Sequence, residues 1–339
     1  MSKAIGFDFG TSCTAYCAQG LNEIKLTPSV IAVNQKSGQL LAVGNEARKM
    51  IGRAPSAIEL IRPVKNGQAV DAGGIATIIC DIFENLELSS VLKKAAIYAT
   101  VPHTSSKDNG ERILQNAINE VGRASLDFVD TPIAIALGAG MPPESKKGSL
   151  IVDIGAGQVT SSVITHGMTL LSCSINTAGD AMTAAVAEYV ANEHGIAVGE
   201  LTAELIKVKL GTLNPDAPNK SLKISGKVIA DKSSKHGNKI TATEIITSQE
   251  LIPVLTPFAD KIVDTITQAL KNTMPEVSAE ILDLGIILSG GGAALDGMTK
   301  YIHNALGIKV ASTKSPAQDA AKGLLRIMNG GRAFAKFTR

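Results

Sequence analysis

The 339-residue sequence predicts an α/β protein of two similar domains that face each other across a cleft. Three observations support this prediction. The segment "AIGFDFGTSCTAYCAQ" at 4–19 returns in similar form as "SLIVDIGAGQVTSSVI" at 149–164. Each copy is followed by further strands and then by helices, so the repeat is about 145 residues long, much longer than a solenoid unit. A chain of this length also suggests two domains of about 150 residues each.

The composition favours a soluble globular protein in a reducing compartment. Hydrophobic residues make up 45% of the chain and charged residues 19%, which is enough apolar material for real cores. The four cysteines form no Cys-x-x-Cys pair, as is usual in the cytosol. The N-terminus lacks the pattern of a signal peptide, and no apolar stretch approaches the roughly 18 residues of a spanning helix. We therefore expect a cytoplasmic protein, with any membrane contact peripheral.

Nucleic acid is not an expected partner. Aromatic residues are only 3% of the chain and tryptophan is absent, so the stacking surfaces that bind single strands are not available. The net charge is +2 and the sequence contains no long basic block.

In the first half, local patterns predict strands and helices in alternation. Strands are expected at 4–9 and 14–18 around a Gly-Thr-Ser turn, and extended segments in "KLTPSVIAV" and "LLAVG". Helical spacing follows in "NEARKMIGR", and after the loop "RPVKNGQAVD" a longer helix is expected at about 74–86. "AAIYATVP" is a buried-strand pattern, "KDNGERILQNAINEVGR" an amphipathic helix, and "DFVDTPIAIALGAGM" a strand, a turn and a helix.

The second half repeats this order. "SLIVDIG" and "VTSSVITHG" predict a hairpin, "LLSCSIN" a third strand, and "AGDAMTAAVAEYVANEHG" and "TAELIKVKLG" two helices. "KSLKISGKVIADKSSKHGNKITATEI" is typical of a polar hairpin with a Ser/Lys/Gly tip. A long helix is expected at about 247–273, and "LGIILSGGGAAL" predicts a strand that ends in a glycine-rich turn.

The two matching turns carry the first chemical signal. Their small residues let backbone N–H groups approach an anion closely; they are Gly10, Thr11 and Ser12 in one turn and Gly155, Ala156 and Gly157 in the other. One such turn alone would more often be a hairpin without a ligand. Two matching turns, with Asp8 and Asp153 just upstream, predict a pair that grips a polyphosphate from opposite sides. The aspartates would then orient the water shell of a Mg²⁺ ion.

A third glycine-rich segment supplies a second signal. In "ILSGGGAALDG", the glycines Gly290, Gly291 and Gly292 follow an apolar strand. A flexible turn is one interpretation, but a buried strand that ends in three glycines favours close approach to the base or sugar of a nucleotide.

These segments together resemble the actin-like ATPase superfamily, which includes actins, DnaK-type chaperones and sugar kinases. "FDFGTSCTAYC" and "VDIGAGQVTSSVI" resemble its two phosphate motifs, and "IILSGGGAALDGM" its adenosine motif. Within the superfamily the chain is most similar to the MreB-type bacterial actins, and "AVGNEARKMIGRAPSAIELIRPVKNG" is the most specific match.

The resemblance implies the actin-like ATPase fold, in which two duplicated RNase H-like α/β domains face each other across a nucleotide cleft. The first domain would span 1–148, with a small inserted subdomain at about 28–73. The second would span 149–314, with a small subdomain at about 181–246. A C-terminal helix within 315–339 would pack back on the first domain.

The resemblance also assigns the site. Asp8, Gly10, Thr11 and Ser12 would surround the β- and γ-phosphates of ATP or ADP, and Asp153, Gly155, Ala156 and Gly157 would lie opposite, with Mg²⁺ held through water by Asp8 and Asp153. Gly179, Asp180, Glu204 and Lys207 would meet the ribose and adenine, and Gly290, Gly291 and Gly292 would line the base pocket. From spacing alone, Glu204 and Lys207 share one helical face, and a surface ion pair is the simpler explanation.

The sequence departs from the family pattern at three places. Thr131 stands immediately before the proline of "VDTPIA", where MreB has a glutamate that positions the attacking water. "GAGQV" replaces the usual Gly-Gly-Gly-Thr, and "AGDAMT" places Met182 and Thr183 where the family has Phe and Asp. Loss of the carboxylate predicts slow hydrolysis with nucleotide binding retained. Asp130 is adjacent, but in an extended segment it would point to the opposite side.

The resemblance implies a cytoskeletal protein that polymerises with itself into filaments, with paired protofilaments as in its family. Leu88, Val91 and Leu92 in the loop "LELSSVLKK" would suit shallow contact with the inner face of the membrane, although ordinary loop packing explains them equally well. Two alternatives stay open: a specialised bacterial actin such as the organelle-positioning MamK, and a small-molecule kinase of the same superfamily. A DnaK-type chaperone would need a further substrate-binding domain.

Overall fold

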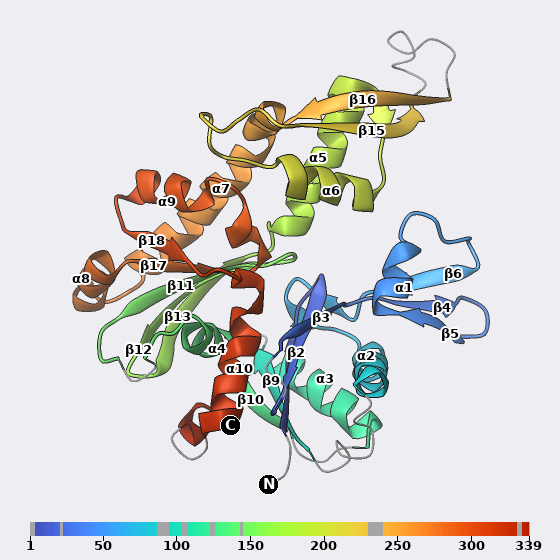
Figure 1. Ribbon diagram of the computed structural model, residues 1–339. Coiled ribbons are helices and arrows are strands. Elements are labelled where there is room, and N and C mark those ends of the chain that lie inside the picture. The colour runs from blue at the N-terminus through green and yellow to red at the C-terminus, as the bar shows by residue number, and fades with distance from the viewer. Residues whose placement is uncertain are drawn as a thin grey trace.

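The computed structural model describes residues 4–20, 23–86, 95–103, 107–122, 126–142, 145–229, 240–330 and 334–338. Its framework is a pair of five-stranded sheets (Figure 1). The first contains β1 (Ala4–Phe9), β2 (Cys13–Ala18), β3 (Lys25–Pro28), β9 (Ala96–Val101) and β10 (Leu126–Asp130). The second contains β11 (Ser149–Ile154), β12 (Val159–Thr165), β13 (Met168–Ile175), β17 (Ile286–Ser289) and β18 (Val310–Ser312).

The two sheets have the same topology. The strand orders are β3-β2-β1-β9-β10 and β13-β12-β11-β17-β18. In each sheet the first three strands are antiparallel, and the last two run parallel to the first strand of the hairpin. The internal duplication predicted from the repeated hairpin is therefore present in the fold. Asp8 and Asp153 occupy the same place in it, the penultimate position of β1 and of β11.

Two helices cover one face of the first sheet, α2 (Ala72–Asn85) and α3 (Lys107–Glu120). Apolar residues at helical spacing on both, including Ile75, Ile79 and Ile118, are buried against the strands. The first of these helices begins two residues before its predicted start at 74. The reason is Asp71, whose carboxylate accepts a hydrogen bond from the Gly74 N–H at 3.1 Å and caps the helix.

In the second half, a larger number of helices covers the sheet. These are α5 (Gly179–His194), α6 (Glu200–Leu210), α7 (Ser248–Lys271), α8 (Pro275–Leu284) and α9 (Met298–Leu306). The predicted long helix corresponds to α7, which starts at a capping box made by Thr247 and Glu250. A continuous apolar core joins these helices to β11, β12 and β17.

Each half also carries a small sheet. In the first half α1 (Gly44–Lys49) packs with β4 (Ile31–Asn34), β5 (Leu40–Val43) and β6 (Ile58–Ile61). In the second half β15 (Ser221–Val228) and β16 (Thr241–Thr247) form the polar hairpin expected from the sequence. β14 (Ile196–Ala197) pairs with β15 and completes a three-stranded sheet. In Figure 1, β15 and β16 lie at the top and β4–β6 at the right, away from the chain ends.

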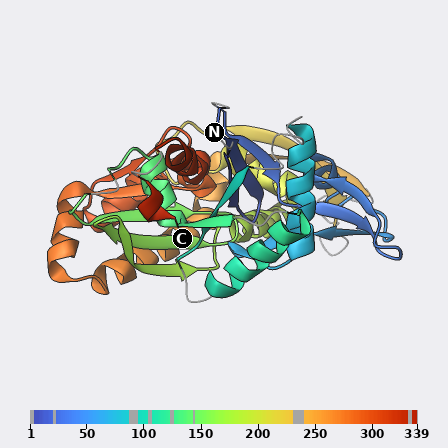
Figure 2. The ribbon, with the colours of Figure 1, turned by 90° about the horizontal axis from the view of Figure 1, so that it is seen from below.

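The two halves are joined through a pair of helices, α4 (Thr131–Gly138) and α10 (Asp319–Gly330). Figure 2 shows α10 nearly along its axis, between the two halves. A Cβ atom at Gly138 would overlap the carbonyl of Asp319, and one at Gly323 would overlap the carbonyl of Ala134. Glycine on each helix therefore lets the two backbones touch. Around this contact a third apolar core contains residues of both halves, among them Ile151 and Leu324.

One local prediction is wrong. A turn was expected between the strand and the helix of "DFVDTPIAIALGAGM", but β10 ends at Asp130 and α4 begins at Thr131. Pro132 lies in the first turn of the helix, where its fixed φ favours helix initiation and its missing N–H costs nothing. The strand therefore passes directly into the helix. In the part of the chain that the structure describes, no helix combines the length and apolar character needed to cross a bilayer.

Candidate functional site

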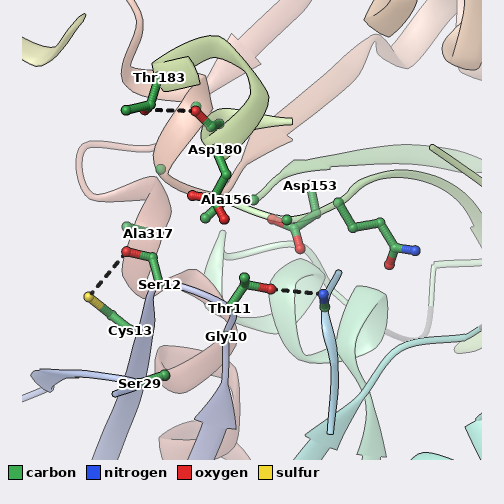
Figure 3. Close-up of a pocket in the computed structure, with 18 of the residues that line it drawn as sticks. Gly10, Thr11, Ser12, Cys13, Ser29, Asp153, Ala156, Asp180, Thr183 and Ala317 are labelled. Atoms are coloured by element: carbon green, nitrogen blue, oxygen red, sulfur yellow. Dashed lines mark hydrogen bonds between the residues drawn. The ribbon is translucent and has the colours of Figure 1, made fainter. Parts of the chain in front are cut away.

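A cleft of about 1030 Å³ lies between the two halves, and both repeated hairpins line it (Figure 3). Every site residue expected from the sequence lies on its wall. From the first half these are Asp8, Gly10, Thr11, Ser12 and Thr131. From the second half they are Asp153, Gly155, Ala156, Gly157, Gly179, Asp180, Glu204, Lys207, Gly290, Gly291 and Gly292. The fold thus brings segments from both ends of the sequence to one cavity.

Asp8 is held by the neighbouring strand. The hydroxyl of Thr100, on β9, donates a hydrogen bond of 2.5 Å to Asp8 Oδ1. Burial raises the pKa of Asp8, although the Thr100 bond favours the charged form. The carboxylate is therefore fixed in position at the wall of the cleft.

The equivalent residue of the second hairpin is Asp153. Its pKa is raised to about 7, first by burial and then by the negative charges of Asp8 and Asp319. Asp319 is itself fully buried and accepts hydrogen bonds from Thr313 and from Ser289. Gly290, with a φ of +79°, lies so close that a Cβ there would collide with the Asp153 carboxylate. The negative charges of Asp8 and Asp319 therefore both act on Asp153, while Asp319 is itself paired with Lys322 at 3.2 Å.

Thr11 connects the first hairpin to a turn that was expected to be part of a loop. In "RPVKNGQAVD" the structure contains a small hairpin, β7 (Val64–Lys65) and β8 (Gln68–Ala69). Its turn residues, Asn66 and Gly67, have φ values of 49° and 70°. The Gly67 N–H donates to Thr11 Oγ1 at 2.8 Å, as the dashed line from Thr11 in Figure 3 shows. The Asn-Gly dipeptide is the sequence signal that predicts such a turn.

The same turn also meets the second hairpin. A Cβ on Gly157 would lie 2.6 Å from Thr11 Oγ1 and 2.9 Å from Asn66 Cα. Three turns, one from each repeated hairpin and one from β7–β8, are thus packed against one another at the wall of the cleft. There is no space for a side chain at Gly157.

Glu204 and Lys207 form an ion pair of 2.7 Å inside the cleft, on α6. Lys207 Nζ also donates to the Gly179 carbonyl at 2.8 Å and to Thr183 Oγ1 at 2.9 Å. The single proton of the Thr183 hydroxyl is within reach of two acceptors, the Glu204 carboxylate and the Gly179 carbonyl. The exposed fractions of the Lys207 and Glu204 side chains are 14% and 34%, so the pair is partly buried in the wall of the cleft. The threonine that departs from the family pattern is part of this network.

Thr131 lines the cleft, whereas Asp130 is absent from the described residues of its wall. The Asp130 carboxylate instead lies 2.9 Å from Nδ1 of His103, which does line the cleft. No pattern in the sequence identified His103, because its relation to Asp130 depends on the pairing of β9 with β10.

Arg62 and Glu200 were also not predicted as site residues. Both line the cleft and form an ion pair between the first half and the start of α6. The loop residues Leu88, Val91 and Leu92, predicted to contact membrane, lie outside the described residues.

Comparison with known proteins identifies the family. The family model described as MreB/Mbl protein matches residues 2–336. The cell shape-determining protein Mbl of Bacillus subtilis is 31% identical over 322 residues, covering 95% of this chain and 94% of that protein. The cell shape-determining protein MreB of Escherichia coli is 27% identical over 344 residues, covering 99% and 97%.

The solved structures that resemble this chain belong to the same kind of protein. MreB 5 of Spiroplasma citri bound to AMPPNP has a TM-score of 0.91 at 26% identity, covering 99% of this chain and 98% of that chain. The same protein bound to ADP has a TM-score of 0.88 at 26% identity, covering 98% and 99%. The MamK double helical filament, with a TM-score of 0.75 at 20% identity over 96% and 98% of the two chains, shares the fold. The duplicated actin-like fold and the match over nearly the whole length lead to one conclusion: this chain belongs to the MreB/Mbl family of bacterial actins.

Proposed function

We propose that the chain binds ATP and ADP, together with Mg²⁺, in the cleft between its halves. The observation that carries this proposal is the placement of Asp8 and Asp153, on two equivalent hairpins, at the wall of one cavity. The N–H groups of Gly10 and Gly155 bond to carbonyls within their own hairpins, and the small residues that follow would let the next N–H groups approach phosphate oxygens. The related MreB 5 of Spiroplasma citri, solved with AMPPNP and with ADP, supports the same ligand class.

The donor set fits a magnesium ion. Asp8 and Asp153 are carboxylates, the ligand type that Mg²⁺ prefers, and their mutual repulsion is what a divalent cation would relieve. Among the described residues there is no group of three or more His, Cys, Asp or Glu side chains arranged to hold a metal alone. That fits an ion that keeps several waters and is completed by phosphate oxygens. Mg²⁺ would supply charge neutralisation on the β- and γ-phosphates.

The nucleoside would lie toward α6 and the glycine-rich turn. Lys207 and Thr183 hold the Glu204 carboxylate in a fixed position, in which it would accept hydrogen bonds from ribose hydroxyls. Gly290, Gly291 and Gly292 line the same cavity and would let the base approach the backbone closely.

Hydrolysis is expected to be slow because Thr131 offers a hydroxyl where a carboxylate would orient water. Phosphate release by the wild type and by Thr131→Glu tests this. The glutamate variant should hydrolyse ATP faster while its affinity for ATP stays within a few-fold. Equal and fast rates in the two proteins would show that Thr131 is not the limiting feature.

We further propose that the nucleotide-bound chain assembles with itself into filaments, with paired protofilaments as the expected form. Its membership of a family of cell shape-determining proteins supports self-assembly, and the MamK filament shows that the fold is compatible with it. We expect these filaments in the cytoplasm, in peripheral contact with the inner face of the membrane through Leu88, Val91 and Leu92.

Sedimentation and electron microscopy, with and without Mg²⁺-ATP, test assembly. Filaments that depend on nucleotide support the proposal, and a protein that stays monomeric at high concentration under every nucleotide condition contradicts it. Co-sedimentation with anionic vesicles, comparing the wild type with a Leu88→Ser, Val91→Ser, Leu92→Ser variant, tests the membrane contact separately.

A further inference from the structure

His103 is the one imidazole among the described residues that line the cleft. Its side chain is 30% exposed, and the Asp130 side chain bonded to it is 14% exposed. The imidazole is therefore accessible from the cavity, while the carboxylate behind it is largely covered.

The sheet places this pair beside the proposed phosphate site. Strands β1, β9 and β10 are parallel, so their carboxyl ends meet at one edge of the sheet, where ligands of open α/β sheets bind. Asp8 lies at that end of β1 and is held by Thr100 near the end of β9. His103 follows Thr100 by three residues, and Asp130 is the last residue of β10.

The hydrogen bond to Asp130 sets the tautomer of the ring. Since a carboxylate can only accept, Nδ1 of His103 carries the proton and donates to Asp130 Oδ2, 2.9 Å away. In the neutral imidazole, Nε2 is then left with a lone pair that can accept a proton. Asp130 stands at the N-cap of α4, yet its side chain does not cap that helix. Its carboxylate is thus directed to the histidine in preference to the helix.

The carboxylates of the cleft, which could also accept a proton, interact with other groups. Glu200 is paired with Arg62, and Glu204 with Lys207. Asp296 accepts a hydrogen bond from Thr212, and the Asp180 carboxylate interacts with the positive charges of Arg62 and Lys207. Asp8 and Asp153 are the pair expected to face the cation. Of the groups that commonly act as general bases, His103 is the one that this part of the cleft offers.

We propose that His103 is the general base of ATP hydrolysis in this chain and that Asp130 positions it. The inference rests on the proposed binding of Mg²⁺-ATP. In this step a water oxygen forms a bond to the γ-phosphorus while the bond from that phosphorus to the β,γ-bridging oxygen breaks, and ADP carries away the electron pair. One proton of the water passes to His103 Nε2, and Asp130 stabilises the resulting imidazolium. The imidazolium then returns its proton to solvent.

The test measures ATP binding and phosphate release separately, on the full chain. Equilibrium binding of a fluorescent AMPPNP analogue with Mg²⁺ is measured first, and then phosphate release at saturating ATP. His103→Gln should keep its affinity for the analogue within about twofold and lose phosphate release by about a hundredfold or more, the usual contribution of a general base. Asp130→Asn should lose about tenfold or more in kcat with little change in KM.

Two further measurements separate a catalytic role from a structural one. Free imidazole added to His103→Gly should restore part of the phosphate release, because it can occupy the space of the missing ring. Asp130→Asn should cause no additional loss in the His103→Gln background, because Asp130 acts through His103. The control is His166→Asn, which removes an exposed histidine from the β12–β13 turn and should leave both measurements unchanged.

The outcomes are distinguishable. Phosphate release that is unaffected by His103→Gln, or a wild type that binds the analogue but releases no phosphate, overturns the assignment of the base and leaves nucleotide binding intact. Absence of binding by the wild type overturns the proposed function itself.

Discussion

Arg62 and Glu200 form an ion pair across the mouth of the cleft, between residues 138 positions apart in the sequence. Arg62 follows β6 of the small sheet in the first half, and Glu200 is the first residue of α6 in the second. The pair therefore connects the two halves on the side opposite the α4–α10 contact, and it must open when the cleft widens.

Breaking this pair should speed nucleotide release. Arg62→Ala should raise the dissociation rate of fluorescent ADP about two- to fivefold, since partly exposed pairs contribute about 0.2–1 kcal/mol. The charge-reversed double variant Arg62→Glu, Glu200→Arg should recover most of the wild-type rate. Lys49→Ala, which breaks the exposed Lys49–Glu46 pair on α1, is the matched control and should have no effect. A rate unchanged in Arg62→Ala would mean that the pair does not hold the cleft closed.

The stability of the nucleotide-free, metal-free protein should fall as pH rises from about 4 to about 7. The pKa of Asp153 is raised from 3.8 to about 7, so in this window the native state keeps a proton that the unfolded chain has released. The stabilisation that the proton on Asp153 provides is fully present below the pKa of this group in the unfolded chain. It is lost as pH rises through the pKa of Asp153 in the folded protein. Urea midpoints at pH 5 and pH 8 measure it. The urea midpoint of Asp153→Asn should be higher than that of the wild type at pH 8 and close to it at pH 5. If the midpoints of the two proteins changed with pH in the same way, Asp153 would not be the source of the pH dependence.

Gly157→Ala should disrupt the meeting of the three turns. The added Cβ would lie 2.6 Å from Thr11 Oγ1 and 2.9 Å from the Asn66 backbone, so these turns must separate. We expect at least about tenfold weaker ATP binding and a destabilisation of about 1–3 kcal/mol, as for other overpacked sites. Isothermal titration and thermal unfolding measure the two effects. Gly110→Ala, in α3 with open space around the added Cβ, is the control and should be neutral or stabilising. Normal ATP affinity in Gly157→Ala would show that the turn contact is dispensable.

Thr183→Val should weaken binding of ATP more than that of 2′-deoxyATP. The substitution keeps the shape but removes the hydroxyl that donates to Glu204 and accepts from Lys207, so the carboxylate loses its fixed position. Competition binding with the two nucleotides gives the ratio. Thr267→Val on α7, which loses a similar hydrogen bond to a backbone carbonyl, controls for the helix itself. An unchanged ratio of the two affinities would contradict a role of this network at the ribose.

Local pattern predicted the duplicated hairpins and the turns beside Asp8 and Asp153, whereas Glu204 and Lys207 were assigned to the site only by the family resemblance. Asp8 and Asp153 each precede a turn of small residues, and this pattern is visible within a few consecutive positions. The fold brings the two turns to one cavity because each follows the equivalent strand of its sheet. Secondary structure was predicted well where periodicity is long, as in α7, and less well at β7–β8, where two-residue strands carry little pattern.

The relations between distant segments could not be predicted in this way. The pairing of His103 with Asp130 depends on the register of β9 and β10, and that of Arg62 with Glu200 on how the halves face each other. The glycines at 138 and 323 are ordinary helix residues in the sequence, and only the crossing of α4 and α10 explains them. The domain boundaries drawn from the sequence stay predictions.

The glycine contact between α4 and α10 has a mechanical consequence. With no side chains between the two backbones at Gly138 and Gly323, and with a shared apolar core around them, this contact fixes the distance between the two halves. The residue seated over Gly138 is Asp319, whose carboxylate also faces Asp153. Asp319 therefore links the carboxylates of the proposed phosphate site to the point at which α4 and α10 touch, and a ligand bound beside Asp153 would act directly on that contact.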